Sequence, residues 1–115
     1  MDVGWVSAAG ASPLALLDTH PGRFRQDHIK NILLSTRAST RLEQDPADVG
    51  DGGIDWPALR GRGVREFYIK REPPFASHTI TAVAYSYRYL DALPDPTAPR
   101  GQQCRPIVVG AIAMC

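Results

Sequence analysis

Residues 64–71 read Val-Arg-Glu-Phe-Tyr-Ile-Lys-Arg, and this stretch decides the fold class that we expect. Its apolar members are valine, phenylalanine, tyrosine and isoleucine, which strands favour. Pro73 and Pro74 follow the stretch and would end a strand there. The sequence therefore predicts a β-strand at 64–71.

Two more strands are predicted downstream. Residues 77–90 alternate between two faces, as in a strand, and one face carries Thr79, Thr81, Val83, Tyr85, Tyr87 and Tyr89. Residues 106–114 form an almost unbroken apolar run, which fits a strand covered on both faces. Residues 93–100 predict a loop, because their prolines have no N–H group to donate to a strand ladder.

Two helices are predicted upstream. Ser12 can cap a helix with its side-chain oxygen and Pro13 suits the first helical position, so we expect a short helix at 14–17. In residues 24–34 apolar side chains recur three to five positions apart and form one stripe, which predicts a second helix. Residues 3–9 predict a short strand.

An acidic loop separates these two halves of the chain. Residues 43–55 hold five acidic residues, three glycines and no basic residue, and a one-turn helix capped by Asp55 is expected at 56–59. One sheet face and one helix stripe can bury each other. The expected fold class is therefore α+β, with two N-terminal helices packed on a small, mostly antiparallel sheet of three or four strands.

Length and charge limit the function classes. The chain has 115 residues, which suits one domain over 1–115. Its formal net charge is only +1, which argues against holding nucleic acid or an anionic membrane by bulk electrostatics. The chain begins with an acid rather than the bases of a secretory signal, and its apolar segment 107–115 is far short of the roughly 20 residues of a membrane span. We expect a cytoplasmic protein with no membrane partner, in which Cys104 and Cys115 are reduced thiols.

The basic residues cluster directly after the acidic loop. Within twelve residues stand five positive charges: Arg60, Arg62, Arg65, Lys70 and Arg71. Arginine can grip the oxygens of a phosphate or of an acidic partner with its forked guanidinium. The alternative is that the acidic loop and the basic segment neutralise each other within the fold.

The tyrosines of the strand predicted at 77–90 are the second candidate surface. Tyr85 and Tyr87, with Arg88 nearby, can anchor a protein interface or stack on bases, because tyrosine combines a large contact area with a polar tip. The alternative is a sheet face covered by helices. Both interpretations stay open at this point.

No arrangement of residues predicts catalysis, and no cofactor or metal site is expected. His28 lies on the apolar stripe of the helix predicted at 24–34, and Ser77 and His78 would face opposite sides of a strand. The acidic loop lacks the spacing of a calcium-binding loop. We therefore expect a non-enzymatic protein-binding regulator or inhibitor that acts through the charged and tyrosine-bearing residues, with another protein as its partner.

An enzymatic alternative comes from a resemblance. The expected element order, together with the run Leu-Arg-Gly-Arg-Gly-Val-Arg-Glu at 59–66, resembles the RelE/ParE-type toxins of bacterial toxin–antitoxin pairs. For the RNA-cleaving branch the resemblance implies that basic residues stabilise developing negative charge, the candidates being Arg65, Lys70, Arg71 and Arg88. It also implies that His78 or a tyrosine moves a proton. RNA is then the alternative partner.

Overall fold

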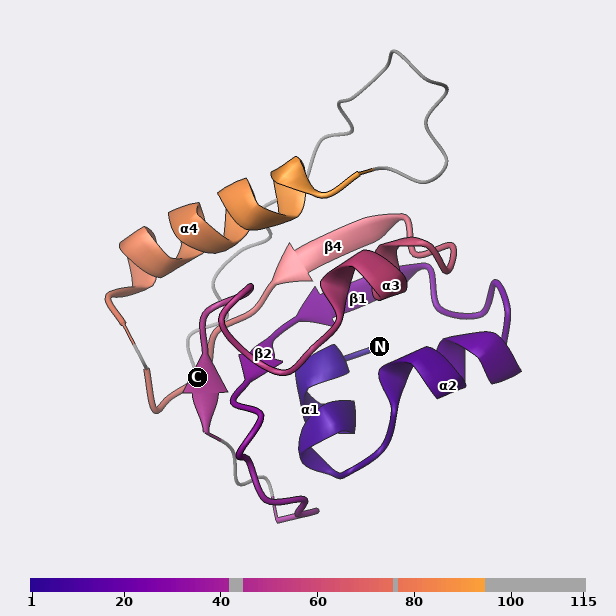
Figure 1. The fold of residues 1–115 in the computed structure, drawn as a ribbon, viewed down its shortest axis with the longest axis horizontal. Coiled ribbons are helices and arrows are strands. Elements are labelled where there is room, and N and C mark those ends of the chain that lie inside the picture. The colour runs from indigo at the N-terminus through magenta and orange to yellow at the C-terminus, as the bar shows by residue number, and fades with distance from the viewer. Residues whose placement is uncertain (42–44, 76, 95–115) are drawn as a thin grey trace.

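The computed structural model describes residues 1–41, 45–75 and 77–94, which contain helices and short strands in an α+β arrangement (Figure 1). The elements in chain order are α1 (Val3–Ala8), α2 (Pro13–Thr19), β1 (Gln26–Ile29), β2 (Asn31–Ile32), β3 (Pro46–Ala47), α3 (Trp56–Arg60), β4 (Glu66–Ile69) and α4 (Thr79–Ala92). The α+β class predicted from the sequence is confirmed.

The strands of the described residues form two separate pairs. β1 pairs with β4 in parallel, with Gln26 opposite Glu66 and Ile29 opposite Ile69. β2 pairs with β3 in antiparallel fashion. The mostly antiparallel sheet of three or four strands is therefore not what these residues form. Parallel neighbours need a long crossover, and here the chain between β1 and β4 supplies it and includes α3.

Three elements were predicted correctly from local signals. The Ser12 hydroxyl accepts a hydrogen bond from the Ala15 N–H (3.2 Å) at the start of α2. The Asp55 carboxylate accepts one from the Ala58 N–H (3.0 Å) at the start of α3. β4 lies within the predicted stretch 64–71. Side-chain capping depends on adjacent residues alone, which explains why the sequence reveals it.

The strand predicted at 3–9 is wrong, because these residues form α1. Asp2 caps the helix through a hydrogen bond that its Oδ1 accepts from the Trp5 N–H (3.0 Å). A Cβ atom on Gly4 would lie 2.7 Å from the Lys30 carbonyl oxygen, so only glycine permits this close packing of α1. The cap and the close approach outweigh the strand preference of the two valines.

The helix predicted at 24–34 is also wrong. Residues of β1 alternate, with Gln26 and His28 exposed and Asp27 and Ile29 buried. His28 and Ile29 therefore point to opposite sides instead of sharing one helical stripe. Hydrogen bonds to β4, far along the chain, override the local periodicity.

The strand predicted at 77–90 is an α-helix, α4. Its fully buried residues are Ala82, Ser86 and Leu90, spaced four apart as on one face of a helix. Burial of this stripe, which places Leu90 in the core, decides the structure against the strand preference of the threonines and tyrosines. The strand predicted at 106–114, and all but the first two residues of the loop predicted at 93–100, lie outside the described residues.

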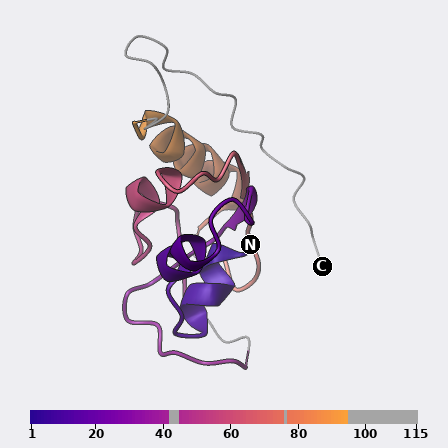
Figure 2. The same cartoon turned by 90° about the vertical axis from the view of Figure 1, so that its right-hand side faces the viewer.

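The hydrophobic core lies on one side of the β1–β4 pair. Its buried members are Val3, Leu17, Ile29, Val49, Trp56, Leu59, Val64, Ile69 and Leu90. α4 lies at one end of the molecule and α1 with α2 at the other, as both views show (Figures 1 and 2). Among the described residues, no helix combines the length and the apolar character that a bilayer crossing requires.

Candidate functional site

The face of the β1–β4 pair that points away from the core is polar. Alternate residues of a strand point to opposite faces, so the burial of Ile29 and Ile69 turns their alternate neighbours outward. Four of these neighbours form two cross-strand pairs, which we call the polar platform: Gln26 with Glu66, and His28 with Tyr68.

Hydrogen bonds hold the platform side chains in place. Glu66 Oε2 accepts one from the Gln26 amide (2.6 Å) and one from the Tyr68 hydroxyl (2.6 Å). The bond to Glu66 stabilises the protonated phenol and raises the pKa of Tyr68. The rings of His28 and Tyr68 stand edge to face, with their centroids 6.5 Å apart and their planes at 83°. Three of the four platform side chains are thus joined through one carboxylate oxygen, and the fourth, His28, contacts the Tyr68 ring.

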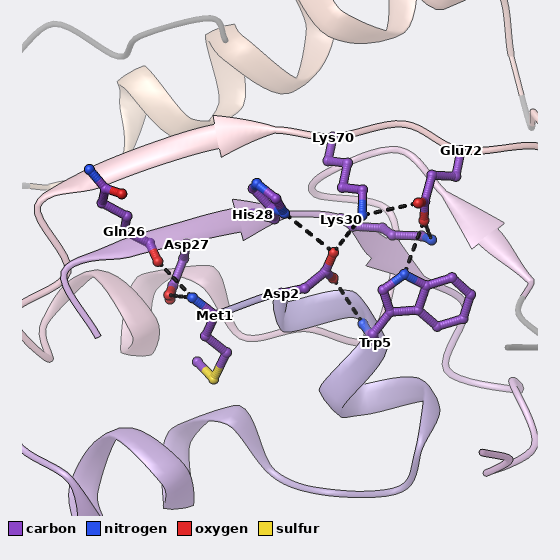
Figure 3. Close-up of polar contacts among 9 residues, drawn as sticks. All are labelled: Met1, Asp2, Trp5, Gln26, Asp27, His28, Lys30, Lys70 and Glu72. Atoms are coloured by element: carbon purple, nitrogen blue, oxygen red, sulfur yellow. Dashed lines mark hydrogen bonds and ion pairs between the residues drawn. The ribbon is translucent and has the colours of Figure 1, made fainter. Parts of the chain in front are cut away.

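A hollow of about 440 Å³ opens beside the platform and is lined by Met1, Asp2, Gln26, His28 and Tyr68. The start of the chain lies along β1, because the His28 N–H donates to the Met1 carbonyl (2.7 Å) and Asp2 pairs with His28 in parallel. His28 Nδ1 lies 3.6 Å from Asp2 Oδ2, longer than a hydrogen bond (Figure 3).

A row of four alternating charges starts at Asp2, which lines the hollow, and we call it the charged row: Asp2, Lys70, Glu72 and Lys30. Lys70 Nζ lies 3.0 Å from Asp2 Oδ2 and 3.0 Å from Glu72 Oε1. Glu72 also binds Lys30 and accepts a hydrogen bond from the Trp5 indole (3.0 Å) (Figure 3). The Lys30 ammonium lies 3.7 Å from the centre of the Trp5 ring, a cation–π contact.

Burial and ion pairing shift the pKa values of the residues in this row in opposite directions. Burial disfavours the ammonium form of Lys30 and lowers its pKa, and the contact with Glu72 opposes that shift. Burial alone would raise the pKa of Glu72, but hydrogen bonds from Lys30 and Lys70 outweigh it and lower the pKa. For Glu72 pairing therefore outweighs burial, as it also does for Lys70, whose pKa is raised by its contacts with Glu72 and Asp2.

Asp27 is the most deeply buried acid near the site, with 1% of its surface exposed. It points to the core side of β1, opposite to the platform. The α-amino nitrogen of Met1 lies 3.1 Å from Oδ1, but neither carboxylate oxygen accepts a well-formed hydrogen bond from the described residues. Burial accordingly raises the pKa of Asp27.

A second cavity, on the other side of the charged row, is too small to be a substrate site. It measures about 20 Å³ and is bordered by residues that include Lys30, Asn31, Arg71 and Ser86. That volume holds about one water molecule. No group of three or more histidine, cysteine, aspartate or glutamate side chains that could hold a metal ion occurs within the described residues.

Most of the arginines predicted to bind a partner instead bind the protein itself. Arg62 pairs with Asp18 (2.7 Å). Arg71 pairs with Asp48 of the acidic loop (3.1 Å), which is the internal neutralisation that the sequence left as an alternative. The Arg60 guanidinium donates to the carbonyl oxygen of Leu90.

The other predicted site residues are spread over the surface. Lys70 belongs to the charged row, while Arg65 and Arg88 are exposed. The tyrosine ladder on a strand is wrong, because in α4 the tyrosines point to different sides. Tyr85 is 44% exposed and donates to Asp51 (2.8 Å), whereas Tyr87 packs against the core.

The sequence missed Gln26, His28, Glu66 and Tyr68 as site residues. The apolar spacing of residues 24–34 puts His28 on a helical stripe, and the pattern of residues 64–71 predicts a strand without indicating a site at Glu66 or Tyr68. Exposed and buried residues alternate along β1, and this alternation marks Gln26 and His28 as outward-facing. It becomes recognisable only once the pairing of β1 with β4 is known. Chemically, the four offer hydrogen-bond donors, acceptors and two aromatic rings, a set suited to recognition.

Comparisons with known proteins add no relative: no protein-family model, curated protein or solved structure matches the chain.

Proposed function

We propose that the protein is a non-enzymatic protein-binding regulator or inhibitor whose docking surface is the polar platform and its hollow. The observation that carries this proposal is the set of platform hydrogen bonds at Glu66, beside a hollow of about 440 Å³. Side chains that are ordered before binding lose less conformational entropy when a partner docks. Tyrosine is also among the residues that contribute most to protein interfaces.

This surface is not the one that the sequence predicted. Of the predicted binding residues, Lys70 reaches the lining of the hollow through its ion pair with Asp2, and Arg65 directly precedes Glu66 in the chain. Arg62 and Arg71 would have to break internal ion pairs before they could bind a partner. An exposed arginine that already has an internal ion pair gains little free energy by exchanging it for an ion pair with another protein.

RNA is the less favoured partner. The element order that resembles the RelE/ParE-type toxins requires strands at 3–9 and 77–90, and these residues belong to α1 and α4 instead. The platform itself carries the Glu66 carboxylate, which repels phosphate. The experiment below therefore also tests the alternative, an RNA-cleaving toxin.

The test is capture of a partner from a lysate of the native host, compared between matched variants. The double variant His28→Ala, Tyr68→Ala should lose a captured protein by at least about tenfold. Arg88→Ala, an exposed change on α4, should retain it. All three proteins should have the same melting temperature.

Two results would overturn the proposal. Equal capture by the double variant would remove the platform as the docking surface. Discrete cuts in cellular RNA after induction of the protein, absent with His78→Ala, would replace the binding function with the enzymatic alternative.

A further inference from the structure

The charges around the hollow are unequally paired. Asp2, on its lining, is paired with Lys70 at 3.0 Å. Glu66 does not itself line the hollow, but it is hydrogen-bonded to two residues that do, the amide of Gln26 and the hydroxyl of Tyr68, and both of these partners are neutral. Next to the lining there is therefore one exposed carboxylate that forms no ion pair with a cation of the described residues.

The free acceptor capacity of Glu66 lies on one oxygen. Both hydrogen bonds go to Oε2, so within the described part of the chain Oε1 keeps its two acceptor positions. A donor that approaches Oε1 does not have to displace Gln26 or Tyr68. Charge-assisted hydrogen bonds to a carboxylate are the stronger kind.

Two aromatic rings stand close to this carboxylate. His28 and Tyr68 line the hollow with their planes at 83°, so a group inside it meets a ring face beside a ring edge. Ring faces attract cations, and guanidinium stacks on them more readily than ammonium does. The hollow of about 440 Å³ is large enough to admit one long side chain.

We propose that the hollow binds an arginine side chain, with Glu66 Oε1 accepting from the guanidinium and with the face of one of the two rings, Tyr68 or His28, stacked on its plane while the edge of the other lies beside it. The inference deepens the proposed function, on which it rests for the source of the ligand: the arginine belongs to the partner protein. Its chemistry can nevertheless be tested without that partner.

The experiment is an NMR titration of the isotope-labelled protein with N-acetyl-arginine amide, whose blocked ends leave the guanidinium as its charge. The backbone amides of His28, Glu66 and Tyr68 should shift and saturate. N-acetyl-citrulline amide, which has nearly the same shape and no charge, should bind at least about fivefold more weakly, as a charge-assisted contact requires. N-acetyl-lysine amide with a free ammonium should fall between the two.

Variants then identify the carboxylate. Glu66→Gln keeps an oxygen acceptor and removes the charge, and it should weaken arginine amide binding at least about fivefold. Asp91→Asn, which removes another exposed carboxylate, on α4, should leave binding unchanged. Tyr68→Phe tests whether the shift depends on the ring or on the hydroxyl, and ring stacking predicts that binding remains.

Three outcomes would overturn the inference: equal binding of citrulline and arginine amides, unchanged binding by Glu66→Gln, or shifts confined to residues outside the hollow. These failures can be told apart from failure of the docking proposal. If the platform variant no longer captures the partner and the wild type does not bind arginine amide, only the arginine inference is wrong. If the protein binds arginine amide saturably but captures no partner, only the proposed docking function is wrong.

Discussion

At the scale of single residues, Glu72 links three parts of the chain. Its carboxylate binds the indole of Trp5 in α1, the ammonium of Lys30 after β1 and the ammonium of Lys70 after β4. Lys30 is only 4% exposed, and an ammonium group at that depth depends on its partner. The stability of the charged row should therefore depend mainly on Glu72.

Replacing Glu72 by glutamine should lower the unfolding free energy by about 2 kcal/mol at neutral pH, because a hydrogen-bonded charge pair is lost. Pairing lowers the pKa of Glu72 below its usual 4.5 in the folded protein. The stabilisation that Glu72 contributes is therefore fully present above pH 4.5. It is lost as the pH falls through the pKa that Glu72 has in the folded protein, which is lower than 4.5. Urea unfolding at neutral and acidic pH measures both, and a variant as stable as the wild type at neutral pH would contradict the prediction.

Asp27 should show the opposite dependence on pH. Its pKa is raised by burial, so the folded state binds a proton more readily than the unfolded state does. The wild type should therefore lose stability relative to Asp27→Asn as the pH rises from 3.8, the ordinary pKa of aspartate, through the higher pKa that Asp27 has in the folded protein. The measurement is the difference in unfolding free energy across this range, which removes any constant effect of the amide. A difference that changes in the other direction would refute the prediction.

At the scale of elements, the assignment of 79–92 to a helix can be tested with proline. Ala84 is exposed in the interior of α4, where proline should cost about 3 kcal/mol or more by removing a helical hydrogen bond. Thr79 is the first residue of α4, where proline is tolerated. Urea unfolding should show Ala84→Pro far less stable than Thr79→Pro. Similar losses in both variants would be incompatible with α4.

The elements that the sequence predicted correctly are those whose signals are local. Ser12 and Asp55 cap helices whose first turns they begin, and their side chains act on residues three positions away. β1 depends instead on β4, where the partner of Gln26 is 40 residues distant. A pattern confined to residues 24–34 holds no information about that partner, and its apolar spacing happened to fit a helix.

The candidate site was unpredictable for the same reason. Gln26 and His28 become a surface only when β4 brings Glu66 and Tyr68 beside them. The charge clusters were visible in the sequence, but whether a charge pairs internally depends on tertiary distances such as that from Arg71 to Asp48. From the sequence both outcomes stay open, and for Arg71 the structure decides in favour of internal pairing.

At the scale of the whole molecule, one thin sheet separates two environments. The β1–β4 pair turns Ile29 and Ile69 toward the core and turns the polar platform outward. The chain start lies along β1 through the bridge between Asp2 and His28, so the platform, which lies on β1 and β4, is also bordered by the residues that precede α1. A partner on the platform thus contacts segments from both halves of the described chain.

The internal pairing of the arginines has a kinetic consequence. Arg62 and Arg71 are held by Asp18 and Asp48, and the formal net charge is +1, so little field extends into the surrounding water. If the proposed docking holds, diffusional encounter with the partner would proceed without long-range attraction, at the roughly 10⁵–10⁶ M⁻¹ s⁻¹ of neutral surfaces. Tight binding by this protein would have to come from slow dissociation, and residence time is the quantity on which its affinity would depend.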